Sequence, residues 1–401
     1  MMNSQPQPQS RRTPPRSRRP PSIRYPCRPS PGYLSTSAVF SLLLASSFVS
    51  VVHAQNGRTA INLDNMETMF NFGDSWSTTG YVPEAGKVRE LEGIGKTSSG
   101  GYNWIQYLAY ANPKLATSYY DLARSEATTN NSIVSASVPC FIDQVNIWKK
   151  WFTGNESEVK WDSNTTLFTV WFGINDVGFA TVSNQNSSDQ QPHIFITYWN
   201  VINSLYAAGA RNILLMGVPP THRTPFIQGT NELIISTLER YITEYNRHLY
   251  EFAMALPKIH PKMNIALFDT GSFLNTILDH PEQYGFKHSK YFCEEYGATK
   301  NKPNDSLEIC GAPLEQFVWY DTYHPTWAVH RLLASVLVEM LTPPEPEFDA
   351  PYTTLTILPE MLATDPTSQA HSDASRGIEF DWTLLSIALG STVLGLLVGS
   401  L

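Results

Sequence analysis

Between its two ends, this 401-residue chain alternates short apolar runs with longer amphipathic ones, and that alternation constrains the fold more than any other feature. Strands that alternate with helices favour a parallel sheet covered on both faces. The binding crevice of such a sheet lies at the carboxyl ends of its strands. The pattern predicts strands at residues 69–72, 167–172, 212–216 and 264–268, and helices at residues 193–210, 231–255 and 327–341.

The first predicted strand runs directly into Gly73-Asp74-Ser75. A serine at a sharp turn after a strand holds its hydroxyl out at the edge of the sheet, where a general base can reach it. Ser75 is therefore the leading candidate for a nucleophile. A serine after a strand can also simply cap a helix, so the prediction needs partners for Ser75 elsewhere in the chain.

Two later motifs supply those partners. Gly173-Ile174-Asn175-Asp176 follows the second predicted strand, and Asp321 lies three residues before His324, in front of the last predicted helix. That spacing lets the carboxylate hold one imidazole nitrogen while the other nitrogen faces a serine hydroxyl. All three motifs in this order are expected by chance in about one chain in several thousand. A catalytic serine explains them better than a capping serine.

These motifs resemble blocks I, III and V of the GDSL or SGNH hydrolases, a family of esterases and lipases. Two more stretches, Val218-Pro219-Pro220 and residues 138–145 at the start of a helix, resemble the fungal branch that includes the acetylesterases of carbohydrate esterase family 16. The resemblance extends over about residues 60–342. It implies an α/β fold of the SGNH hydrolase type, which is a flavodoxin-like three-layer sandwich with a parallel sheet.

The resemblance also implies the role of each residue at a matching motif position. Ser75 attacks an acyl carbonyl, His324 takes its proton, and Asp321 orients His324. The oxyanion of the tetrahedral intermediate is held by the backbone N–H of Ser75, by the side-chain amide of Asn175 and by a backbone N–H from block II. This chemistry needs no cofactor and no metal.

Block II departs from the family pattern, because Glu126 stands where a glycine is expected. A glutamate keeps the backbone N–H, but it does not tolerate the dihedral angles that glycine adopts freely. A carboxylate beside a developing oxyanion would also repel it. Either Glu126 turns its side chain away from the site, or the enzyme is impaired; losing one oxyanion donor typically slows such enzymes by about 10²- to 10³-fold.

Residues next to the candidate triad are candidates for the substrate pocket. Trp76 follows the candidate nucleophile and Tyr323 lies between Asp321 and His324, so each can either line a pocket or pack structurally. Other histidines show no spacing typical of a metal site. We expect them to be surface residues or locally hydrogen-bonded: His222, His248 and His330.

The first 54 residues predict a leader that is not part of the folded domain. Residues 1–32 carry seven arginines, nine prolines and no acidic residue, a composition that cannot bury enough apolar surface to fold. An apolar run at about residues 38–52 then ends in Val52-His53-Ala54, which is typical of a signal peptide. The alternatives are cleavage, an internal translation start, or retention as an N-terminal anchor. We expect cleavage and a secreted product.

Charge and cysteine usage agree with a secreted enzyme. Without the seven leader arginines, 21 basic and 36 acidic side chains remain, a net charge of −15. Nothing in this charge balance attracts nucleic acid. Cys293 and Cys310 flank a polar segment before the Asp321 loop, and we expect them to form a disulfide that pins it. Cys140 is then left over, and we expect a buried thiol. Five sequons predict N-glycosylation, at Asn130, Asn155, Asn164, Asn186 and Asn304.

The C-terminus predicts attachment to a membrane. Residues 55–345 would form the hydrolase domain, residues 346–377 a polar linker, and residues 378–401 a hydrophobic tail. The tail has no basic residue after its apolar run, which fits a GPI-anchor signal better than a retained transmembrane helix. We therefore expect a GPI-anchored protein at the cell surface, with a single-pass membrane protein as the alternative.

Three functions fit these observations. The first is a monomeric serine esterase that removes acetyl groups from carbohydrates through an acyl-enzyme. The second is a lipase or phospholipase acting on longer acyl chains, although no broad, lid-like apolar segment favours it. The third, motivated by Glu126, is a catalytically weakened surface protein that binds glycans.

Overall fold

The structure, a computed structural model, describes residues 49–50, 61–83, 96–154, 157–298 and 306–342. The chain divides into two units, Met1–Glu345 and Pro346–Leu401, and all described residues belong to the first. Apart from Val49–Ser50, the predicted leader lies outside the described residues, as do the linker and the hydrophobic tail. Within the described ranges, no helix is long and apolar enough to cross a membrane.

The described strands form one sheet in the order β1-β6-β5-β4-β2-β3. Neighbours from β6 to β3 run parallel, and β1 pairs antiparallel with β6 at one edge. The five parallel strands therefore have the flavodoxin-like order, whose reversal point lies between β2 and β4. The strands are β1 (Val49–Ser50), β2 (Thr68–Gly73), β3 (Tyr119–Asp121), β4 (Thr166–Trp171), β5 (Asn212–Met216) and β6 (Asn264–Phe268).

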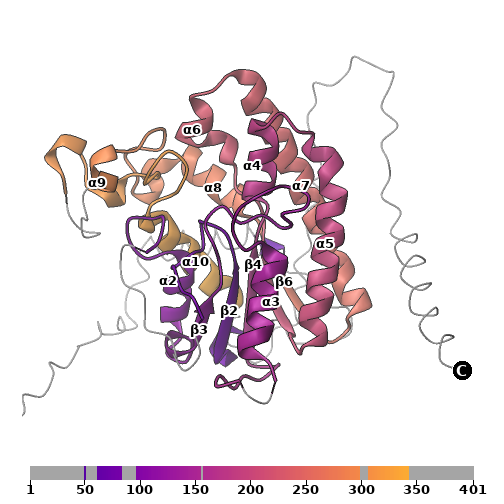
Figure 1. Ribbon diagram of the computed structural model, residues 1–401. Helices are drawn as coiled ribbons and strands as arrows, with labels where there is room; N and C mark the ends of the chain where they lie inside the picture. Colours follow the sequence, from indigo (N-terminus) through magenta and orange to yellow (C-terminus); the bar gives the residue numbers. More distant parts are fainter. Residues whose placement is uncertain (1–48, 51–60, 84–95, 155–156, 299–305, 343–401) are drawn as a thin grey trace, which may run out of the picture. The chain divides into compact units, whose positions relative to one another are not determined.

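Helices cover both faces of this sheet (Figure 1). α3, α5 and α7 pack in succession, and α2 packs on α10. Right-handed connections from β2 to β3 and back to β4 place α2 and α3 on opposite faces. The longer helices are α2 (Trp104–Ala111), α3 (Phe141–Phe152), α4 (Ile174–Val182), α5 (Ser187–Ala207), α7 (Glu232–Ile259), α8 (Thr270–Asp279) and α10 (Trp327–Leu341), and the short ones are α6 (Pro225–Gln228) and α9 (Glu294–Ala298).

The predicted three-layer α/β fold is confirmed, and β5, β6 and α10 have the predicted bounds. α5 starts six residues earlier than predicted because Asn186 caps it: the Asn186 side-chain oxygen accepts the backbone N–H of Ser188. Pro192 therefore lies inside this helix, near its N-terminus. The short strands β1 and β3 were not predicted, because runs of two and three residues carry no readable periodicity.

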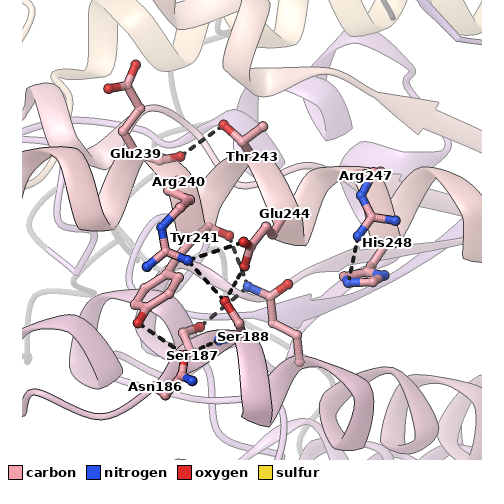
Figure 2. Close-up of polar contacts among 11 residues, drawn as sticks. Asn186, Ser187, Ser188, Glu239, Arg240, Tyr241, Thr243, Glu244, Arg247 and His248 are labelled. Carbon is pink, nitrogen blue, oxygen red and sulfur yellow. Dashed lines mark hydrogen bonds and ion pairs between the residues drawn. The ribbon is translucent and has the colours of Figure 1, made fainter. Parts of the chain in front are cut away.

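The same N-terminus of α5 is tied to α7 by a polar cluster (Figure 2). The Tyr241 hydroxyl donates to the Asn186 side-chain oxygen over 3.3 Å, and the Ser188 hydroxyl hydrogen-bonds the Glu244 carboxylate. Arg240 completes the cluster with an ion pair to Glu244 at 3.2 Å. These contacts fix α5 against α7 on one face of the sheet.

The predicted glycosylation sites have different surroundings. Asn164 and Asn186 are exposed, whereas Asn130 is half-buried and its amide nitrogen donates to Thr197 over 3.1 Å. The remaining two, Asn155 and Asn304, lie outside the described residues. Glycosylation stays a prediction at all five.

Candidate active site

The turn that carries Ser75 is anchored where β2 ends. The Gly73 N–H donates to the side-chain oxygen of Gln144 over 3.0 Å, and the Gln144 amide nitrogen donates back to the Gly73 carbonyl over 2.9 Å. Arg124 also donates its backbone N–H to that carbonyl, over 3.1 Å. A Cβ at position 73 would stand 3.0 Å from the Ser77 hydroxyl, so the glycine leaves room for the tight turn that follows. These contacts fix the start of the turn.

The predicted triad residues lie in one hydrogen-bonded chain. His324 Nε2 is 2.8 Å from Ser75 Oγ, and His324 Nδ1 is 2.9 Å from Asp321 Oδ2. A carboxylate beside Nδ1 favours the tautomer with the proton on Nδ1, which leaves Nε2 as an acceptor for the serine hydroxyl. Ser75 comes from the end of β2 and the other two from the loop before α10, where His324 lies 249 residues after Ser75. The geometry is that of a serine activated by a general base.

The loop bearing Asp321 is held by hydrogen bonds between the Asp321 side chain and its own backbone. Asp321 Oδ1 accepts the backbone N–H groups of Tyr323 and His324, each over 2.7 Å. Burial alone would raise the pKa of the Asp321 carboxyl, but the hydrogen bonds and charge of His324 outweigh it and hold that pKa below its ordinary value. Asp321 therefore stays ionised and able to orient the imidazole.

A disulfide joins Cys293 to Cys310 in the segment before this loop. The segment is attached to the chain that leads into Asp321: the Trp319 indole N–H donates to the Ser289 carbonyl over 2.8 Å, and the Val318 N–H donates to the His288 carbonyl over 2.8 Å. Cys140 is a free, buried thiol, as predicted. The disulfide thus closes a loop that directly follows the residues supporting the Asp321 loop.

Hydrogen bonds join the two segments that carry the candidate oxyanion donors Asn175 and Glu126. The Asn175 amide nitrogen, at the start of α4, donates to the Ala127 carbonyl over 3.0 Å. The next residue, Asp176, accepts the Thr129 backbone N–H over 3.0 Å and the Thr129 hydroxyl over 3.2 Å. Residues 124–129 are therefore held against both Gly73 and α4. Among the described residues, no acceptor takes the backbone N–H of Ser75 or Glu126.

Glu126 occupies the glycine-like conformation that the family pattern requires. Its φ is 66°, in the left-handed region, and its side chain is exposed. Such a conformation costs a residue with a Cβ about 1–2 kcal/mol. The conformation of this loop thus survives the substitution, and the carboxylate is solvated.

Two buried carboxyls lie beneath the site. Asp74 is fully buried, and that burial, together with the charge of Asp176, raises its pKa to about 8. Burial also raises the pKa of Asp176 to about 6. At neutral pH the Asp74 carboxyl is mostly protonated, so it adds little negative charge next to the place where an oxyanion would form.

The two predicted pocket residues differ in exposure. Tyr323 is half-buried, and a Cβ on Gly178 would stand 3.2 Å from its hydroxyl, which places that hydroxyl beside α4. Trp76 is only 3% exposed and packs edge-on against Trp171 at 5.7 Å. Tyr323 can therefore face a substrate, whereas Trp76 acts in this conformation as a core residue.

His330 was expected at the surface or in a local hydrogen bond, and that prediction was wrong. The residue is 2% exposed, and its Nδ1 has no hydrogen-bond partner among the described residues. Burial and the neighbouring His324 lower the pKa of His330 to about 3. It lines a small apolar pocket together with Trp76 and Pro325. His330 is buried because it lies in the first turn of α10, all four residues of which are buried.

Sequence reasoning also gave no role to Gln144. Its side chain is fully buried, yet it satisfies both backbone groups of Gly73. The available signal was a polar residue on the apolar face of the amphipathic helix after Cys140. A buried polar residue in such a place must have partners.

Comparison with known proteins decides the family. A model of GDSL-like lipases and acylhydrolases matches residues 69–337. The chain belongs to this family. This GDSL hydrolase is a carboxylic ester hydrolase, and its predicted resemblance to fungal acetylesterases is confirmed.

Individual relatives share between 14% and 30% sequence identity with this chain. An acetylesterase from Thermothelomyces thermophilus is 30% identical over 281 residues, which are 68% of this chain and 87% of that protein. A thermolabile hemolysin from Vibrio parahaemolyticus is 26% identical over 294 residues, 70% of this chain and 65% of that protein. A catalytic mutant of an acetylxylan esterase from Geobacillus stearothermophilus has a solved structure with 14% identity and a TM-score of 0.39, covering 69% and 94% of the two chains.

Proposed function

We propose that this GDSL hydrolase is a secreted or cell-surface acetylesterase that removes acetyl groups from carbohydrates through an acyl-enzyme on Ser75. The observation that carries the proposal is the hydrogen-bonded chain from Ser75 Oγ through His324 to Asp321. It supplies a nucleophile, a base and an orienting carboxylate at the carboxyl edge of the sheet.

In the proposed reaction, Ser75 Oγ attacks the acetyl carbon while its proton passes to His324 Nε2. The carbonyl oxygen becomes an oxyanion, which accepts hydrogen bonds from the Ser75 N–H, the Asn175 amide and the Glu126 N–H. Collapse of the intermediate breaks the ester bond, and His324 gives its proton to the departing sugar oxygen. Water then attacks the acetyl-enzyme with the same histidine as base, releasing acetate and restoring Ser75.

Preference for acetyl groups rests on the fungal resemblance and on the relative that is itself named an acetylesterase. Location at the cell surface rests on the leader, the sequons and the hydrophobic tail of the sequence. A GPI anchor remains our preferred form of attachment, with a retained transmembrane helix as the alternative.

A series of acyl chain lengths tests the substrate class. The full chain is assayed against acetyl, butyryl and octanoyl esters of one alcohol, and we expect kcat/KM to be highest for the acetyl ester. A maximum at the octanoyl ester would contradict the proposal, because a pocket for long acyl chains gains free energy with each buried methylene. That result would favour the lipase alternative.

The glycan-binding alternative has one specific observation in its favour. Glu126 carries a Cβ and a negative charge at a position whose backbone is left-handed. We favour the active enzyme because the N–H is retained and the side chain is exposed. Assay of Glu126→Gly separates the two, because a large gain in turnover would favour the weakened, glycan-binding protein.

A further inference from the structure

Among the described phenylalanines, only Phe226 has an exposed side chain. Its relative exposure is 50%, on the short helix α6, while aromatic side chains at the centre of the sheet, such as Phe70 and Phe168, are fully buried. A phenylalanine left in water gains free energy when a ligand covers it. An exposed ring beside a candidate active site is therefore a candidate contact for substrate.

The backbone of Phe226 is hydrogen-bonded to the loop of the candidate general base. The backbone N–H of Phe226 donates to the Thr322 carbonyl over 2.8 Å. Its ring centroid lies 6.5 Å from that of Tyr323, edge to face, and the Tyr323 ring lies 5.9 Å from the His324 imidazole. An aromatic series thus leads from His324 through Tyr323 to an exposed ring.

The proposed chemistry determines which part of the substrate lies on this side. His324 takes the proton from Ser75 and returns it to the departing oxygen, so the alcohol of the ester must be next to His324. The acetyl group, in contrast, lies between Ser75 and the oxyanion donors. We propose that Phe226 binds the sugar ring of the alcohol portion by stacking against its C–H face, while Tyr323 lies between Phe226 and His324. This inference rests on the proposed function and adds a specificity-determining residue to it.

The support beneath Phe226 is preorganised. Thr224 caps α6 and Pro225 is its first residue, which fixes the backbone just before the ring. The Thr224 hydroxyl donates to the Thr221 carbonyl over 2.8 Å, and α6 packs against α7. A ring held on such a support loses little entropy on binding, as a preorganised contact surface requires.

Phe226→Ala tests the inference when acetate release is measured from two esters. For an acetylated xylo-oligosaccharide we expect the KM to rise about 10-fold while kcat changes less than about two-fold, because the ring contacts a remote part of the substrate. For ethyl acetate, whose alcohol cannot cover the ring, we expect both constants to change less than about two-fold. Phe226→Trp should retain the wild-type KM.

Ile259→Ala is the matched control, because Ile259 is also 50% exposed but lies at the opposite end of the 28-residue helix α7 from α6. It should leave both esters unaffected. A second readout is independent of turnover: calorimetry on Ser75→Ala should show that the acetylated xylo-oligosaccharide binds about 10-fold more weakly when Phe226→Ala is added.

The outcomes distinguish failure of the sugar-binding role of Phe226 from failure of the proposed esterase function. If the wild-type chain releases acetate but Phe226→Ala affects both esters equally, or affects neither, the sugar-binding role is overturned while the esterase proposal stands. If the wild-type chain releases acetate from neither ester, the proposed function fails and this inference fails with it. A selective rise in KM that Phe226→Trp does not share supports the inference.

Discussion

Two positions beside the candidate oxyanion hole adopt left-handed backbone, and they accept different residues. Gly173 has φ of 115° and Glu126 has φ of 66°. A Cβ on Gly173 would stand 2.4 Å from the ring of Tyr245 and 2.6 Å from a methyl group of Val218, whereas Glu126 points into solvent. Position 173 thus requires glycine because of both the available space and the backbone conformation. At position 126 only the backbone conformation favours glycine. The α4 side of the site is fixed by packing, and the residue 124–129 side by hydrogen bonds.

Gly173→Ala should have the larger effect of the two substitutions. The new Cβ must displace Tyr245 or Val218, which moves the start of α4 and with it Asn175. We expect kcat/KM to fall by about 10²- to 10³-fold, the loss typical of a misplaced oxyanion donor. The free energy of unfolding should fall by several kcal/mol, on the order of 2–5, from backbone strain and overpacking. Steady-state assays and thermal unfolding measure both, and wild-type activity would show that packing does not fix this side.

Asp176→Asn tests the burial of the carboxyl that joins the two sides. Burial raises the pKa of Asp176 in the folded protein to about 6, above its ordinary value of 3.8. Such a carboxyl contributes stability that is fully present below the unfolded pKa and is lost as pH rises through the folded pKa. Wild type should therefore lose on the order of 3 kcal/mol relative to Asp176→Asn between about pH 4 and pH 8.

Thermal unfolding of both proteins at several pH values gives the measurement for Asp176. The difference in Tm between wild type and Asp176→Asn should change steadily across pH 4–8 and level off beyond about pH 8. Parallel curves would mean that Asp176 does not titrate in this range, and the assigned burial effect would be wrong.

Glu126→Gly should have the smallest effect. Glycine adopts the left-handed region without a Cβ penalty, but it gains entropy in the unfolded chain, so we expect a net stabilisation of about 0.5–1 kcal/mol. Activity should change less than about three-fold, because the backbone N–H is already in place. Asn184→Gly is the matched control, since Asn184 also has a left-handed φ, 54°, but follows α4 at its far end. A gain in turnover of about 10²-fold would instead favour the weakened, glycan-binding protein.

The sequence predicted the fold and the candidate triad because both depend on local patterns. Buried strands such as Asn212–Met216 appear as unbroken apolar runs, and Ser75, Asp321 and His324 lie in motifs with fixed spacing. The packing between segments could not be predicted in the same way. Gln144 and Phe226 act through contacts with Gly73 and Thr322, 71 and 96 residues away, and no short pattern records such contacts.

Glu126 also shows, at a single residue, that a short motif does not predict the surroundings of a side chain. Its motif position predicted the need for glycine-like backbone, and the structure has that conformation. Whether the side chain turned toward the site depended on what surrounds the loop, which the motif does not contain.

Acetate release by the full chain and by Ser75→Ala, measured side by side on an acetylated saccharide, tests the nucleophile most directly. We predict that the substitution lowers kcat by roughly 10⁴-fold or more while the protein stays folded, because it removes the hydroxyl that His324 activates. Release by Ser75→Ala at the wild-type rate would show that Ser75 is not the nucleophile.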